Sequence, residues 1–186
     1  MRARAAAVLS ACMAAAGFAA AGPARVSVGR GENGAYKITG GFEARAPASV
    51  AWSVLTDYEG LGKFVSSIRS SRVLKRTAHG AVLEQTGAAR FLFVSRQVTL
   101  TLAVEETPQS RLDFKDADGR QFDRYEGSWT IAPSSAGCRV DYELTALPGP
   151  TLGPRFAVKS ALKSGARGQL DGVRAEIERR AAAAKL

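Results

Sequence analysis

The side chains that could carry out acid–base or nucleophilic chemistry are few, and they are spread along the sequence. His79 is the single histidine, and the segment Ala78-His79-Gly80 predicts an exposed turn between two strands. A nucleophile needs a base within hydrogen-bond reach, so the usual histidine base is missing. Carboxylates could replace it, since Glu84, Glu126 and Glu143 fall in predicted strands. A buried Glu126 could act as a general acid or base; the alternative is an outward-facing salt bridge.

Metal and disulfide chemistry have little support in the sequence. The two cysteines, Cys12 and Cys138, are far apart, and no cluster of Cys and His residues has the spacing of a metal site. We interpret Cys138 as a small buried hydrophobic residue rather than a reactive thiol. The sequence therefore predicts no metal and no cofactor.

Composition indicates one globular domain behind an export signal. The 186 residues are 46% hydrophobic and 23% charged, which excludes a disordered, collagen-like or multi-span membrane protein. Residues 1–21 combine a basic start, an alanine-rich apolar run and the small residues Ala19-Ala20-Ala21, as in a cleavable signal peptide. We expect a periplasmic or secreted protein. An alternative is a lipoprotein, because Leu9-Ser10-Ala11-Cys12 is similar to a lipidation box.

Apolar periodicity divides the remaining chain into strands and helices. Residues 22–34, rich in glycine and polar side chains, predict a flexible lead-in to a domain at 35–186. A strand is expected over residues 35–46, then a helix that begins at Pro47 and a short helical turn over 61–65. Six further strand signals follow, at residues 68–77, 81–88, 90–106, 111–117, 122–132 and 138–147. The connections between them are short, so successive strands must pair antiparallel.

The pattern after Pro148-Gly149-Pro150 is helical to the end of the chain. One apolar stripe runs along this helix, formed by Leu162, Ala166, Leu170, Val173 and Ile177. A long helix is the element best able to cover the inner face of the sheet. The predicted fold class is α+β, a helix-grip fold in which a curved antiparallel sheet wraps a long C-terminal helix, with two short helices after the first strand.

The segment from Phe42 to Leu61 resembles the opening of START-like (SRPBCC) proteins, and it is most similar to their coenzyme Q-binding and polyketide cyclase branch. Later matches are Phe93-Val94-Ser95-Arg96, Gly127-Ser128-Trp129 and the C-terminal helix, so the resemblance covers nearly all of residues 35–180. It implies a hydrophobic cavity between the sheet and the C-terminal helix. Members of this superfamily include binders, cyclases and transfer proteins, so the resemblance indicates the fold better than the ligand.

Aromatic residues fall on the elements that would surround such a cavity. The strand and helix positions are Phe91, Phe93, Tyr125, Trp129, Tyr142 and Phe156, with Tyr58 and Phe64 near the short helices. These rings either line a ligand pocket or fill the core. Strand parity counted back from Val104 places Arg96 on the inner face, where it needs a partner, either Glu126 or the polar end of a ligand.

The C-terminal helix is also strongly basic. The whole chain has a formal charge of +9, which removal of Arg2 and Arg4 lowers to +7. Arg155, Lys159, Lys163 and Arg167 recur every four residues, and we expect Lys159 to form a cationic mouth above the apolar Leu162. The alternatives are a solvated face or transient contact with an anionic membrane surface. Glycines at 165, 168 and 172 predict either a hinge that lets the first turns lift or close packing on the sheet.

These features favour an exported, non-enzymatic binder or carrier of a hydrophobic small molecule of lipid, isoprenoid or quinone type. The alternative is a cyclase-like or hydrolytic enzyme that uses Glu126 or Arg96 with a tyrosine in the same cavity. We expect a monomer. We expect no nucleic acid as partner, because an exported protein rarely meets it and no recognition motif is present.

Overall fold

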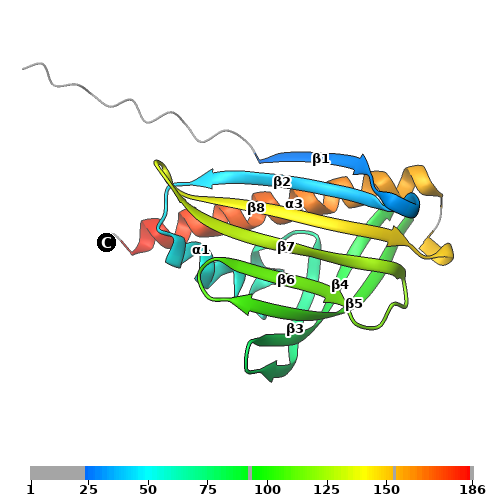
Figure 1. Cartoon of the computed structure of the whole chain (residues 1–186), viewed down its shortest axis with the longest axis horizontal. Helices are drawn as coiled ribbons and strands as arrows, with labels where there is room; N and C mark the ends of the chain where they lie inside the picture. The colour runs from blue at the N-terminus through cyan, green and yellow to red at the C-terminus, as the bar shows by residue number, and fades with distance from the viewer. Residues whose placement is uncertain (1–23, 92–93, 153, 185–186) are drawn as a thin grey trace, which may run out of the picture.

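A continuous antiparallel sheet of eight strands dominates the computed structural model, which describes residues 24–91, 94–152 and 154–184 (Figure 1). The strands are β1 (Arg25–Arg30), β2 (Tyr36–Ala44), β3 (Ile68–Thr77), β4 (Gly80–Phe91), β5 (Val94–Thr107), β6 (Arg111–Asp116), β7 (Phe122–Ser134) and β8 (Gly137–Pro148). Their order across the sheet is β1-β2-β8-β7-β6-β5-β4-β3, and every neighbouring pair is antiparallel. The sheet therefore has β1 at one edge and β3 at the other.

Alternation along the strands separates an inner face from an outer face. On β5, Leu100, Leu102 and Val104 are buried, and Val98 packs against the core in the same register. The β7–β8 hairpin turns at Gly137, whose φ of 133° is a region that L side chains rarely adopt. A Cβ there would also lie 2.7 Å from the carbonyl oxygen of Ala44. This turn therefore requires glycine.

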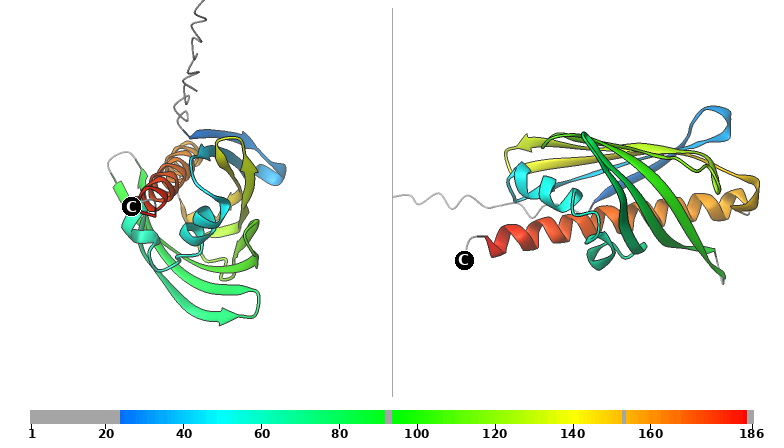
Figure 2. Two further views of the ribbon diagram at one scale, coloured as in Figure 1. Left: turned by 90° about the vertical axis from the view of Figure 1, so that its left-hand side faces the viewer. Right: turned by 90° about the horizontal axis from the view of Figure 1, so that it is seen from below.

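Three α-helices cover the inner face. They are α1 (Ala48–Leu55), α2 (Leu61–Phe64) and α3 (Arg155–Ala183), and two single 3₁₀ turns, η1 (Glu32–Gly34) and η2 (Pro150–Leu152), join other elements. The end-on view in Figure 2 shows the sheet curving around α3, with α1 and α2 beside it. The helix-grip fold predicted from the sequence is confirmed. Within the described residues, no helix is both long enough and apolar enough to cross a membrane.

The second half of α3 is packed tightly against the rest of the domain. Leu170, Val173 and Ile177 are at most 1% exposed. A Cβ on Gly172 would lie 2.3 Å from the Phe64 carbonyl oxygen, and one on Gly168 would lie 3.2 Å from the Ser66 hydroxyl oxygen. Close packing therefore accounts for these two glycines, while a Cβ on Gly165 would meet nothing within 4 Å.

The edge strand β1 differs from the sequence expectation. Residues 22–34 were expected to form a flexible lead-in, but Arg25–Arg30 pairs along its whole length with β2. The reason is tertiary: Val26 and Val28 are the only bulky apolar residues of the segment, and they pack against the core. Two alternating valines are a weak strand signal on their own. Residues 1–21, including the predicted signal peptide and Cys12, lie outside the described residues.

Candidate functional site

The space between the inner face of the sheet and α3 contains two adjoining compartments. The inner compartment, about 70 Å³, lies next to α1 and α2 and is bounded by Leu55, Leu83 and Val173. The outer compartment, about 130 Å³, lies beneath the first turns of α3 and is bounded by Val98 and Leu162. Ile68, Gln85, Tyr125 and Gln169 line both compartments, so the two form one elongated cavity.

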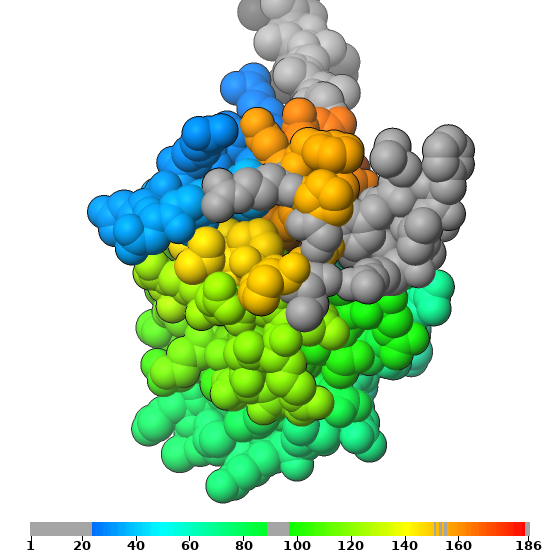
Figure 3. Space-filling model, turned by 90° about the vertical axis from the view of Figure 1, so that its right-hand side faces the viewer, coloured from blue at the N-terminus to red at the C-terminus, as the bar shows by residue number. Residues whose placement is uncertain are grey.

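Figure 3 views the end of the molecule at which the outer compartment lies. The first turns of α3, in orange, lie beside β1 and β2, in blue, and above β7 and β8. Leu152 of η2 and Val158 of α3 line the compartment at this end. The opposite end of the cavity is covered by α1 and α2.

Strand register gathers the aromatic side chains that the sequence predicted. Trp129 of β7 pairs with Tyr142 of β8, and their ring centroids are 4.5 Å apart. Tyr142 also stacks on Phe114, and Tyr125 lies 4.9 Å from Phe122. Tyr125, Trp129 and Tyr142 all line the inner compartment, as predicted. These rings are therefore both core and cavity wall.

The two cavity tyrosines form a hydrogen-bonded pair of neutral hydroxyls. Burial raises the pKa of Tyr125 to about 12 and raises the pKa of Tyr142 well above its usual range. Both hydroxyls are therefore protonated at neutral pH. They can donate and accept hydrogen bonds, but they cannot serve as a base there.

Tyr58 closes the inner compartment from the side of the short helices. Its hydroxyl donates a hydrogen bond of 2.7 Å to Glu106, and the Arg76 guanidinium lies 5.2 Å from its ring centroid. Burial, followed by the bond to Glu106, raises the pKa of Tyr58 far above its usual value. Phe64 is partly buried and faces Arg180, at 5.9 Å, and it lines neither compartment.

Several neutral polar residues that line the cavity were not predicted from the sequence. Gln85 and Gln169 border both compartments, and Ser67 borders the outer one. The Gln85 amide donates to the Ser71 hydroxyl at 3.4 Å, and the buried Ser67 hydroxyl has no partner among the described residues. A signal existed for two of them. Gln85 follows Ala81 and Leu83 with a spacing of two, and Gln169 lies one turn before Val173.

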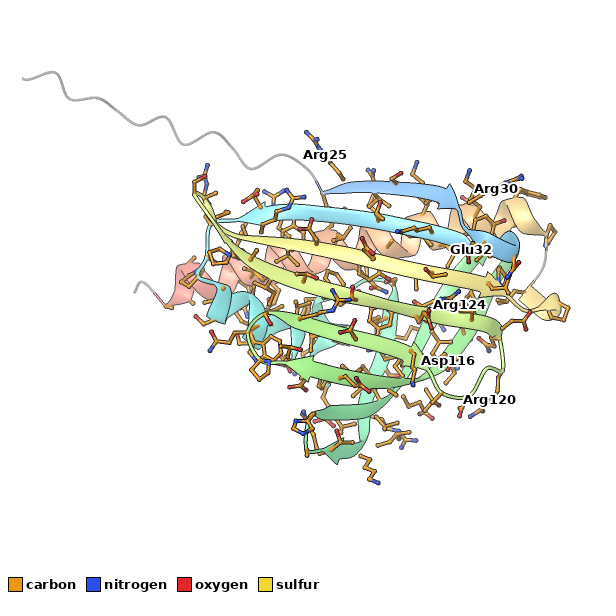
Figure 4. The ribbon with its side chains drawn as sticks, viewed as in Figure 1. Arg25, Arg30, Glu32, Asp116, Arg120 and Arg124 are labelled. Carbon is orange, nitrogen blue, oxygen red and sulfur yellow. The ribbon has the colours of Figure 1, made fainter. Side chains whose placement is uncertain are left out.

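Several predicted site residues lie elsewhere. Glu126 is on the outer face, since it is adjacent to the inward Tyr125, and it forms an ion pair with Arg124. Figure 4 shows Arg124 on the outer surface with Asp116 and Arg120. The structure therefore places Glu126 outside the two compartments, in the outward salt bridge that was its alternative.

Of the site residues predicted on α3, one lines the cavity and two lie on the exposed side of the helix. Leu162 lines the outer compartment as predicted, but Phe156 is 67% exposed and Lys159 is exposed. The first turns of α3 face the cavity with Val158, Ala161, Leu162 and Gly165, which leaves Phe156 and Lys159 on the other side. The expected cationic mouth at Lys159 is therefore wrong.

Three predicted residues cannot be assigned to the site. Phe93 lies outside the described residues, and so do the side chains of Phe91 and Arg96, although their backbones belong to β4 and β5. Among the described residues, no cluster of His, Cys, Asp and Glu side chains could hold a metal ion. Cys138 is fully buried, which confirms its interpretation as a hydrophobic core residue.

Comparison with solved structures identifies proteins of the same fold. A START superfamily protein from Mycobacterium smegmatis is 16% identical, with a TM-score of 0.60 over 80% of this chain and 98% of its own. A STAR-related lipid transfer protein from Xanthomonas axonopodis is 18% identical, with a TM-score of 0.60 over 82% and 98%. An aromatase/cyclase from Streptomyces sp. R1128 is 15% identical, with a TM-score of 0.63 over 84% and 95%. At these identities the similarity establishes the fold.

Comparison by sequence is informative at the level of the family. A search of curated proteins gives no significant match. The family model described as polyketide cyclase/dehydrase and lipid transport matches residues 45–174, which is most of the chain and includes both short helices, the six strands from β3 to β8, and much of α3. The predicted resemblance to START-like proteins is thereby confirmed, and the chain belongs to the polyketide cyclase/dehydrase and lipid transport family.

Proposed function

We propose that this protein binds and carries an uncharged hydrophobic molecule, of lipid, isoprenoid or quinone type, in the cavity beneath α3. The observation that carries the proposal is the chemistry of the wall. Among the described residues that line the two compartments, none is Asp, Glu, His, Lys or Arg. A charged group would lose its hydration there without a described partner of opposite charge, whereas an apolar body would not.

The neutral polar groups of the wall suit hydroxyl or carbonyl groups on the ligand. Gln85 and Gln169 each offer an amide donor and an amide acceptor at the junction of the compartments. The buried Ser67 hydroxyl, unpartnered within the described residues, adds a third group at the outer compartment. Concave apolar sites with a few such groups are typical of small-molecule binding.

The size of the cavity indicates that it must widen when a ligand enters. Ligand sites usually measure about 300–1,000 Å³, and the two compartments, at about 130 and 70 Å³, are smaller. The wall most able to move is the first half of α3, where Gly165 faces the outer compartment without a close neighbour. We therefore include in the proposal that the first turns of α3 lift away from the sheet when a ligand enters.

The composition of the wall supports carriage over catalysis. The titratable groups in the described wall are Tyr58, Tyr125 and Tyr142, and burial raises the pKa of each. General acid–base catalysis needs a group whose pKa lies near the working pH. Glu126, the carboxylate expected to support an enzyme, lies on the outer face.

Nile red, an uncharged dye with a carbonyl group, provides the direct test. We expect saturable binding with a blue-shifted emission, and about fivefold weaker binding by Gln169→Leu, which removes one hydrogen-bonding amide. Gln97→Leu, at an exposed position of β5, is the matched control and should bind as the wild type does. Native mass spectrometry of protein purified from its own cells should show a co-purifying neutral lipid. Absence of saturable Nile red binding by the wild type would refute the proposal.

We also propose that the protein works outside the cytoplasm, as the basic start and alanine-rich run of residues 1–21 indicate. Sequencing of the mature N-terminus should find Gly22 or a close neighbour. An intact N-terminus on cytoplasmic protein would refute export, and a lipid-modified Cys12 would establish the lipoprotein alternative instead.

A further inference from the structure

The first half of α3 presents an exposed stripe on the side away from the cavity. The stripe consists of Phe156, Lys159, Lys163 and Arg167, here called the Phe156 stripe. At 100° per residue these four positions fall within about 80° of one another around the helix. Phe156 is 67% exposed, and the three cations are exposed too. Of the described large hydrophobic side chains, only Leu74 of β3, 47% exposed, is comparable.

The positive charges of this stripe are not neutralised by the described part of the protein. Residues 155–170 contain no Asp or Glu, and Lys159, Lys163 and Arg167 form no ion pair with a described residue. Arginines near the same end of the molecule differ, because Arg120 pairs with Asp118 and Arg124 pairs with Glu126 (Figure 4).

Helix stability does not explain this arrangement. Like charges four residues apart repel one another, and residues 155–170 contain no acidic residue that would offset the repulsion. An external anionic surface would relieve this cost, and an exposed aromatic ring beside the cations suits the boundary between headgroups and acyl chains.

We propose that the Phe156 stripe docks the protein on a bilayer surface rich in anionic lipid. The three cations contact headgroup phosphates, and the Phe156 ring enters among the lipids. The same turns of α3 cover the outer compartment from their other side, through Val158, Leu162 and Gly165. Docking thus brings the movable wall of the cavity to the membrane. The purpose of docking, which is exchange of cargo with the bilayer, rests on the proposed carrier function. The evidence for the Phe156 stripe as a docking surface does not rest on that function.

Co-sedimentation of the protein with lipid vesicles tests the docking surface. The wild type should bind vesicles of phosphatidylcholine with about one-third phosphatidylglycerol, should bind pure phosphatidylcholine weakly, and should lose binding at high salt. Lys159→Gln/Lys163→Gln should bind the anionic vesicles roughly 10- to 30-fold more weakly. The control Lys75→Gln/Lys115→Gln removes the same charge at exposed positions of β3 and β6, and it should bind as the wild type does.

A second pair of variants tests the aromatic ring. Phe156→Ala should weaken binding to the anionic vesicles several-fold, because burial of an aromatic side chain in lipid is lost. Leu74→Ala, at the other exposed hydrophobic residue, should leave binding unchanged. Equal losses in both lysine pairs, equal binding by Phe156→Ala and Leu74→Ala, or no vesicle binding by the wild type would each overturn the proposal.

Nile red binding without vesicles separates this proposal from the carrier function. All four variants should bind Nile red as the wild type does, since none of the substituted side chains lines a compartment. Vesicle binding by a wild type that does not bind Nile red would refute the carrier and leave the docking surface. Nile red binding without vesicle binding would refute the docking surface and leave the carrier function.

Discussion

The two halves of α3 solve different physical problems with the same secondary structure. The second half buries Leu170, Val173 and Ile177 completely and brings Gly172 against the backbone of α2. Among the described side chains of the first half, those that are buried are small or β-branched: Ala157, Val158 and Ala166. One half is therefore fixed by packing, and the other covers a cavity.

Charge follows the same division. In the second half, Glu176 accepts hydrogen bonds from Arg179 and Arg180, and Arg180 also pairs with Asp57 beyond the end of α1. In the first half, the cations of the Phe156 stripe have no ion-pair partner among the described residues. The difference shows that packing and ion pairs anchor the second half of α3, whereas the described side chains of the first half lack such ion pairs and bury only smaller groups, which is consistent with the ligand entry and membrane docking that we propose for it.

Removal of a large side chain from each half should give the largest difference in stability. Leu170 is fully buried, so Leu170→Ala should lower the free energy of unfolding by about 3–4 kcal/mol. Leu162 borders the outer compartment and is partly exposed, so Leu162→Ala should cost about 1 kcal/mol or less. Urea denaturation measures both values, and equal losses would contradict the division of α3.

Glycine substitutions should shift stability in opposite directions. Gly172→Ala places a Cβ 2.3 Å from the Phe64 carbonyl oxygen and should destabilise the protein by about 1–3 kcal/mol through overpacking. Gly165→Ala meets no atom within 4 Å and should stabilise it by about 0.5–1 kcal/mol through helix propensity. Thermal denaturation of the two variants measures both changes. Shifts of the melting temperature with the same sign would contradict the division of α3.

The ion-pair network should make stability depend on pH through Glu176. Hydrogen bonds from Arg179, opposed by burial and aided by Arg180, lower the pKa of Glu176 from its ordinary 4.5 to about 2. A carboxylate with a lowered folded-state pKa stabilises the fold above the unfolded pKa, so this contribution is complete above about pH 4.5 and is lost as pH falls toward 2. Glu176→Gln should cost about 1–2 kcal/mol at pH 7 and less at pH 2.5. A cost that does not change with pH would contradict this role.

Sequence reasoning predicted the architecture well because most of its signals are local. Alternation on β5 and the short turns between strands specified an antiparallel sheet, and the apolar stripe from Leu162 to Ile177 specified the covering helix. The prediction failed at β1, where two valines become a strand only because β2 offers an edge and α3 lies nearby.

The candidate site was predicted less completely, because its walls depend on which side of an element faces inward. Tyr125, Trp129 and Tyr142 followed from their strands, and all three line the inner compartment. Phe156 and Lys159 are exposed because the first turns of α3 face the cavity through Val158, Leu162 and Gly165, and helical spacing alone does not show which side of the helix faces inward. Gln85 and Gln169 were not predicted because glutamine is a residue type that is mostly exposed.

Hydrogen exchange along α3, with and without saturating Nile red, tests the central claim most directly. The account predicts that backbone amides of residues 157–168 exchange faster than those of residues 170–177 in the empty protein, because fewer buried contacts hold the first half. Nile red should slow the first group by at least about tenfold and leave the second unchanged. Equal protection of the two groups in the empty protein, with no change on saturation, would contradict a ligand cavity beneath the first half of α3.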